Sequence, residues 1–104
     1  MKSMKVNTQS VNFNADKKLI NFIQKRMDKL DQFYDKVIQS DVYLKLDNTS
    51  EKENKIFEAR VSIPGDSIVV KKQCKTFEEG ADNAASSIER QLKKRKEKSR
   101  AYIQ

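Results

Sequence analysis

Three basic side chains recur at every fourth position near the end of this sequence. They are Arg90, Lys94 and Lys98, and Lys93 stands beside them. Residues four apart are neighbours on a helix surface, so the spacing predicts a ridge of cations along one side of a helix. Such like charges destabilise a helix unless an anion such as a phosphate backbone binds there. For this run by itself, the favoured interpretation is a solvated helix end that keeps the domain soluble.

A second basic cluster lies at Lys25, Arg26 and Lys29. Two helices packed side by side on a sheet would join both clusters into one surface, which indicates nucleic-acid binding more strongly than either run alone. Pairing of Lys25 with Asp28 within the helix is the structural alternative. The residues predicted to bind RNA are Lys25, Arg26, Lys29, Arg90, Lys93, Lys94 and Lys98.

The whole chain is basic as well. It has 22 Lys plus Arg against 15 Asp plus Glu, a net charge of +7 over 104 residues. Most of the excess lies in residues 86–104, where seven basic and two acidic residues give +5. We therefore expect a polyanionic partner. Aromatic residues are sparse, which favours recognition of backbone and shape over reading of unstacked bases.

Several classes of chemistry are excluded by residue type. Histidine is absent, which removes imidazole acid-base catalysis, the usual Ser-His and Cys-His pairs and most zinc sites. Cys74 is the only thiol, and we interpret it as a small core side chain. Two glycines, Gly65 and Gly80, leave no phosphate-binding Gly-rich loop. The sequence predicts no enzyme, no cofactor, no metal and no small-molecule substrate.

Hydrophobic periodicity predicts the elements that hold these residues. Period-two alternation indicates strands, and apolar steps of three and four residues indicate helices. In the first helix, Asn14 is the expected cap and an apolar stripe runs from Leu19 to Tyr34. The predicted strands span residues 4–13, 38–47, 57–63 and 67–75, and the predicted helices span 15–33 and 77–98.

The second helix has a distinct start signal. Thr76 and Glu79 form a capping-box pattern. Gly80 costs roughly 1 kcal/mol inside the helix unless close packing requires it. Lys71, Lys72 and Tyr43 could extend the basic surface, but protection of an edge strand against aggregation is favoured for the lysines.

The predicted order is β-α-β-β-β-α, an α+β fold with two helices on one face of a four-stranded sheet. One domain is expected over residues 1–104, with the basic helix at about 77–98 and a short tail to 104. No apolar run approaches the roughly 20 residues that span a bilayer, so we expect a cytoplasmic protein with no membrane partner.

Several short motifs resemble one bacterial family. They are the IERQLKK run from Ile88 to Lys94, the preceding Ala81-Asp82, the turn Pro64-Gly65, the strand ending in Val11 and Phe13, and the Arg26 to Leu30 rhythm. In order and spacing they resemble the short ribosome hibernation promoting factor and ribosome-associated inhibitor family, also called sigma-factor modulation proteins. In that family, alanine is common where this chain has Gly80.

The resemblance implies a domain that binds the small ribosomal subunit and its rRNA between head and body. It would lie over the path of mRNA and tRNA and inhibit translation in stationary phase or stress, without catalysis. Arg90, Lys94 and Lys98 match the family's basic positions on the second helix, and Lys25, Arg26 and Lys29 match those on the first. Long members add a C-terminal dimerisation domain, so ribosome dimers would need a separate dimerising factor.

Two alternatives stay open. One is a generic RNA-binding or ribosome-assembly domain, which would also bind free rRNA. The other is a protein-interaction module that regulates transcription. Phosphate binding falls steeply with ionic strength, whereas a mainly apolar interface responds much less, so a salt series separates them.

Overall fold

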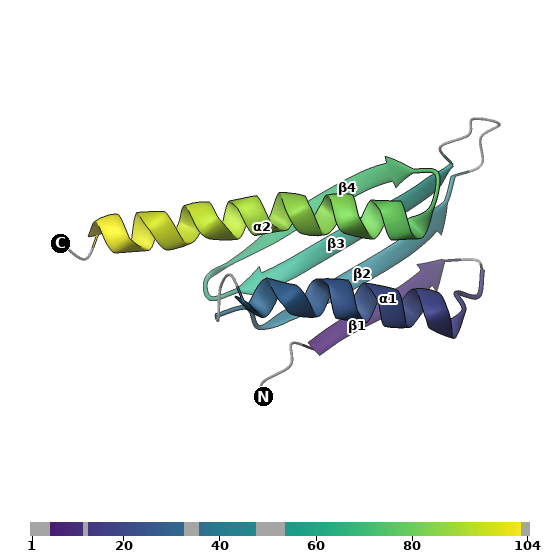
Figure 1. The fold of residues 1–104 in the computed structure, drawn as a ribbon, viewed down its shortest axis with the longest axis horizontal. Coiled ribbons are helices and arrows are strands. Elements are labelled where there is room, and N and C mark those ends of the chain that lie inside the picture. Colours follow the sequence, from purple (N-terminus) through teal and green to yellow (C-terminus); the bar gives the residue numbers. More distant parts are fainter. Residues whose placement is uncertain (1–4, 12, 33–35, 48–53, 103–104) are drawn as a thin grey trace.

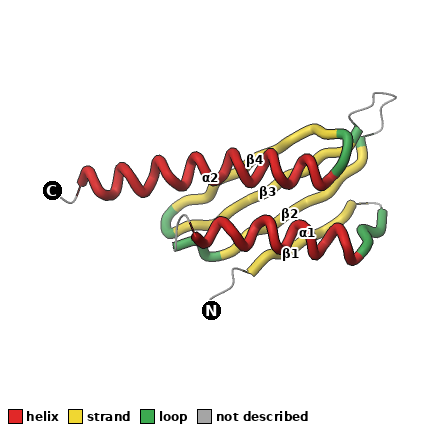
Figure 2. The backbone as a smooth tube through the Cα atoms, in the orientation of Figure 1, coloured by secondary structure: helices red, strands yellow, loops and turns green. Residues whose placement is uncertain are grey.

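We describe the protein from a computed structural model. The described residues are 5–11, 13–32, 36–47 and 54–102, and the side chains of 31, 32 and 98–102 are not considered. The predicted element order is confirmed (Figures 1 and 2). The elements are β1 (Lys5–Val11), α1 (Lys17–Asp28), the 3-10 helix η1 (Lys29–Gln32), β2 (Gln39–Leu46), β3 (Lys55–Ile63), β4 (Asp66–Cys74) and α2 (Phe77–Tyr102).

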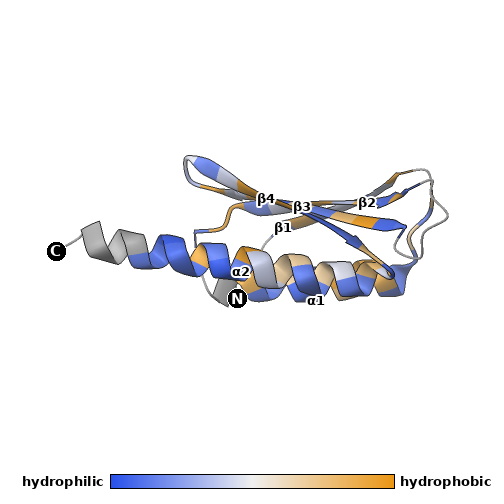
Figure 3. Ribbon diagram, turned by 90° about the horizontal axis from the view of Figure 1, so that it is seen from above, coloured by the Kyte–Doolittle hydropathy of each residue, from blue (hydrophilic) through white to orange (hydrophobic). Residues whose placement is uncertain are grey.

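The sheet has the strand order β1-β2-β3-β4. β1 and β2 are parallel, and the other neighbours are antiparallel. A parallel pair needs a crossover connection, which α1 provides. Both helices lie on the same side of the sheet, and none of the described elements covers the opposite side (Figure 3). The predicted fold class is therefore confirmed.

The core lies between the helices and the inner face of the sheet. Alternate residues of the strands point inward, and α1 and α2 each bury one apolar stripe against them. Leu46, expected on the apolar face with Val42 and Leu44, is 49% exposed because it is the last residue of its strand. The fully buried residues include Val42, Leu44, Phe57, Ala59, Val61, Ile23, Met27, Leu30, Ala84, Ile88 and Leu92.

The start and end of α1 differ from the prediction. Asp16, not Asn14, is the N-cap, and its Oδ1 accepts a hydrogen bond from the Leu19 N–H at 2.8 Å. Both residue types cap well, so composition did not distinguish the two positions. The α-helix ends at Asp28 and continues as η1, and Tyr34 of the predicted stripe lies outside the described residues.

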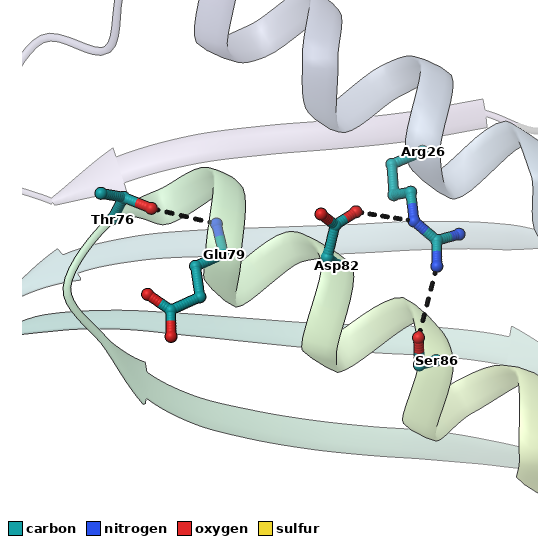
Figure 4. Close-up of polar contacts among 5 residues, drawn as sticks. All are labelled: Arg26, Thr76, Glu79, Asp82 and Ser86. Atoms are coloured by element: carbon teal, nitrogen blue, oxygen red, sulfur yellow. Dashed lines mark hydrogen bonds and ion pairs between the residues drawn. The ribbon is translucent and has the colours of Figure 1, made fainter.

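α2 begins as predicted. The Thr76 hydroxyl accepts a hydrogen bond from the Glu79 N–H at 3.1 Å, one half of the capping box (Figure 4). The helix continues to Tyr102, beyond the predicted end at residue 98. Its C-terminal part therefore projects past the sheet (Figure 1).

Gly80 is required by close packing. A Cβ at this position would lie 2.6 Å from Cys74 Sγ and 2.8 Å from Phe57 Cβ. Cys74 is buried, and its thiol donates a hydrogen bond to the Lys55 carbonyl at 3.4 Å. The expectation of a small core cysteine is confirmed, and the glycine lets α2 approach β3 and β4 closely.

Candidate nucleic-acid interface

α1 and α2 lie side by side and run in the same direction (Figure 1). The basic residues of α1 are in its last turn, at Lys25 and Arg26, and Lys29 follows in η1. Because the two helices are parallel, this basic end of α1 lies beside the middle of α2, near Ser86, and not beside the start of α2 (Figure 1). The two predicted clusters therefore belong to one side of the molecule.

Arg26 links the two helices. Its Nε donates to Asp82 Oδ1 at 2.9 Å and its Nη2 donates to Ser86 Oγ at 3.4 Å (Figure 4). The Arg26 side chain is only 19% exposed, whereas that of Asp82 is 58% exposed. Arg26 is thus a predicted binding residue whose described contacts are to the protein itself. Its geometry suits holding α1 against α2.

The other predicted cations of α1 and η1 face solvent. Lys25 and Lys29 are exposed. The Lys25–Asp28 pair considered as an alternative is not formed among the described residues; instead Asp28 Oδ1 accepts a hydrogen bond from Gln24 Nε2 at 2.9 Å. The Lys25 ammonium therefore stays available to an outside anion.

On α2, Arg90, Lys93 and Lys94 are exposed. Together with Lys25 and Lys29 they form what we call the basic helix surface. The backbone of Lys98 continues the same helix, and its side chain lies outside the described part of the chain. An open hollow on α2 is lined by Ser87, Arg90, Gln91, Lys93, Lys94 and Glu97.

Arg95 belongs to the basic stretch of residues 86–104 but not to the basic helix surface. Its Nη2 donates to Asp66 Oδ2, so it links α2 to the start of β4. The reason is helical geometry: Arg95 follows the buried Leu92 by three residues and so lies near the sheet side of α2. The hydrogen bond from the Ser67 N–H, and then the Arg95 guanidinium, lower the pKa of Asp66 below its ordinary value of 3.8.

Charge is ordered along α2. Its first turn carries Glu78 and Glu79, and its basic residues come later. This order complements the helix dipole and so has a structural reason of its own. It also confines the basic helix surface to the C-terminal half of α2 and the adjacent end of α1.

Tyr43 and Lys71 lie on the other side of the molecule. Tyr43 alternates with the buried Val42 and Leu44, and Lys71 follows the buried Val70, so both point to the helix-free side of the sheet. We call this side the open sheet face. These two residues therefore do not extend the basic helix surface, in contrast to one option that the sequence left open.

No three His, Cys, Asp or Glu residues of the described part of the chain are grouped so that they could hold a metal ion. None of its helices is long and apolar enough to cross a membrane.

Comparison with known proteins now assigns the family. The family model described as "Sigma 54 modulation protein / S30EA ribosomal protein" matches residues 6–100. The chain belongs to this family. It is also 26% identical over 101 residues to a ribosome hibernation promoting factor of Pseudomonas putida, a match that covers 97% of this chain and 95% of the relative.

Two solved structures share the fold. A ribosomal subunit interface protein from Coxiella burnetii superposes with a TM-score of 0.77 at 19% identity, covering 89% of this chain and 98% of that protein. The N-terminal domain of Protein Y from Thermus thermophilus gives a TM-score of 0.72 at 20% identity, with coverages of 89% and 98%. These likenesses support the β-α-β-β-β-α architecture of the family.

One residue that the sequence reasoning passed over is Phe22, which is 37% exposed on α1. The sequence could have indicated its exposure. Phe22 falls outside the apolar stripe formed by Leu19, Ile23 and Met27, and in the sequence it stands between Lys18 and Lys25.

Proposed function

We propose that this protein is a ribosome-binding hibernation factor. In this proposal it docks on the small subunit over the mRNA and tRNA path and inhibits translation in stationary phase or stress. The observation that carries the proposal is the parallel pairing of α1 and α2, which gathers the basic helix surface on one exposed side. Membership of the family, and the name of the relative from Pseudomonas putida, support the ribosome as the partner.

The mechanism is electrostatic docking followed by steric exclusion. Exposed Lys and Arg side chains neutralise rRNA phosphates and release condensed counterions, which supplies most of the affinity. Lys25, Lys29, Arg90, Lys93, Lys94 and Lys98 are the proposed contacts. Arg26 acts as a positioning residue, because its bonds to Asp82 and Ser86 fix the two helices relative to each other. No bond of a substrate is made or broken, so the protein is no enzyme in this proposal.

The partners follow from the same chemistry. The small ribosomal subunit and its rRNA present a dense array of phosphates, and the protein would meet them in the cytoplasm. A separate ribosome-dimerising factor is a further proposed partner.

Co-sedimentation with isolated small subunits, whole ribosomes and free rRNA across a salt series tests the proposal. We expect saturable binding near one copy per subunit, loss of binding at high salt and competition by tRNA. The double variant Arg90→Ala with Lys94→Ala removes two proposed contacts and lowers the salt slope by about two. The matched control is Arg60→Ala with Lys71→Ala, which removes the same charge from exposed residues of β3 and β4.

Each other outcome contradicts the proposal in a defined way. Equal, non-saturable binding to any RNA indicates a generic RNA-binding domain. Absence of binding at low salt indicates a protein-interaction module. Equal losses in the two double variants indicate that net charge alone, rather than the basic helix surface, determines binding.

A further inference from the structure

Among the residues whose side chains the structure describes, Phe22 is the exposed aromatic residue. Phe57 and Phe77 are buried, Phe13 stacks on Phe77 with ring centroids 5.4 Å apart, and Tyr43 is half-buried in β2. Phe22 is 37% exposed although the core lies directly beneath its helix. A single exposed apolar residue needs no explanation by itself, so its surroundings decide.

Cations surround this ring on α1 and at the start of η1. Lys18 precedes Phe22 by four residues, Lys25 follows by three and Lys29 by seven, and all three lysines are exposed. Residues at these spacings share one side of a helix with Phe22. The ring is therefore an apolar, π-bearing surface within a group of exposed ammonium groups.

The position of Phe22 relative to α2 is also fixed. Arg26 follows Phe22 by four residues and bonds to Asp82 and Ser86, so Phe22 is one turn earlier on the side of α1 that faces α2. The earlier turns of α2 carry Glu78 and Glu79. Phe22 thus lies between the basic helix surface and an acidic helix start.

We infer that Phe22 stacks on an unpaired nucleobase of the RNA that binds the basic helix surface. This inference rests on the proposed function and names one subsite within it. Single-stranded RNA combines anionic phosphates with uncharged aromatic bases, and proteins bind it by pairing cations with aromatic rings. Lys25 and Lys29 contact the phosphates. The base carries no charge, so it stacks on the Phe22 ring near the acidic start of α2 without repulsion.

The charges around Phe22 indicate which class of partner binds there. A basic protein segment would be repelled by Lys18, Lys25 and Lys29, and a purely apolar partner would have to desolvate their ammonium groups. An RNA strand carries both anionic phosphates, which the lysines attract, and uncharged aromatic bases, which stack on Phe22. The interaction adds base stacking to the backbone recognition that the sequence predicts.

Binding of four variants to isolated small subunits across a salt series tests the inference. Phe22→Ala and Phe22→Leu should bind roughly 5- to 150-fold more weakly, because stacking on one base has that typical magnitude. Their salt slope should equal that of the wild type, since no phosphate contact is lost. Phe22→Trp should bind at least as tightly as the wild type. Ile20→Ala is the matched control, because Ile20 is 38% exposed on the same helix.

Four results would overturn the stacking inference. They are unchanged affinity of Phe22→Ala, wild-type affinity of Phe22→Leu, an equal loss in Ile20→Ala, and a reduced salt slope in the Phe22 variants. Thermal unfolding of each variant verifies that the fold is retained. If Lys25→Ala weakens binding while Phe22→Ala does not, only the stacking fails. If the wild type does not bind, the proposed function fails with it.

Discussion

At the scale of single residues, contacts divide the basic side chains into two groups. Arg26 and Arg95 bond to carboxylates of their own chain, whereas Lys25, Lys29, Arg90 and Lys94 are exposed. Both arginines have the forked donors that suit bonds to a second element. A count of charges in the sequence does not separate the groups, since the distinction depends on which helix side meets a neighbour.

The role of Arg26 can be tested against Lys25. Arg26→Ala should lower the free energy of unfolding by about 0.2–1 kcal/mol, the usual range for an exposed ion pair. It should weaken ribosome binding less than Lys25→Ala does, because Lys25 is the proposed phosphate contact. Urea denaturation and co-sedimentation measure the two effects. If Arg26→Ala instead lowers the salt slope by one unit and leaves the free energy of unfolding unchanged, Arg26 contacts RNA.

The tight contact at Gly80 leads to a stability prediction. Alanine is the better helix former by about 1 kcal/mol, but overpacking a core costs about 1–3 kcal/mol. With Cys74 Sγ at 2.6 Å and Phe57 Cβ at 2.8 Å from the added Cβ, we expect Gly80→Ala to be destabilising. Cys74→Ala combined with Gly80→Ala should recover part of the loss. Stabilisation by Gly80→Ala in urea denaturation would disprove the close approach.

At the scale of elements, the sequence predicted most of what the structure contains. Alternation identified all four strands, because β2, β3 and β4 each have one buried face and Val6 of β1 packs partly buried against the core. The stripe from Phe77 to Leu92 identified α2. Element ends were less predictable, as at Asp16 and Asn14, where two capping residues compete. The partners of Arg26 and Arg95 could not be predicted, since they depend on how elements far apart in the sequence pack.

The start of α2 is the element boundary with the clearest energetic consequence. Thr76→Ala removes the hydroxyl that accepts from the Glu79 N–H and should cost about 1 kcal/mol of unfolding free energy. Thr76→Ser keeps the acceptor and should stay close to the wild type. Urea denaturation of both variants measures the difference, and equal losses would mean that the methyl group, not the cap, is important.

At the scale of the whole molecule, the bond between Arg95 and Asp66 ties the long helix to the sheet. The folded protein lowers the pKa of Asp66, so its charge stabilises the fold at pH values above the ordinary 3.8. This contribution is lost as the pH falls through the lowered folded-state pKa. It is therefore complete at neutral pH and absent in strong acid.

Asp66→Asn tests this linkage. The variant should unfold at lower urea concentration than the wild type at neutral pH, and the difference should shrink below about pH 3.8 as the wild-type carboxylate becomes protonated. Arg95→Gln should show a smaller pH-dependent difference, because the Ser67 N–H is the larger cause of the shift. A difference that is constant from neutral to acidic pH would contradict the assignment.

The open sheet face is the side that a protein docked through the basic helix surface exposes to solvent. If the basic helix surface meets the ribosome, a cysteine introduced at Arg60 or Lys71 should stay reactive toward a maleimide label in the complex. One introduced at Lys94 should be protected. The native Cys74 is buried and so contributes little background labelling. The same side is then the attachment point for fluorophores, and the epitope by which an antibody would detect hibernating ribosomes.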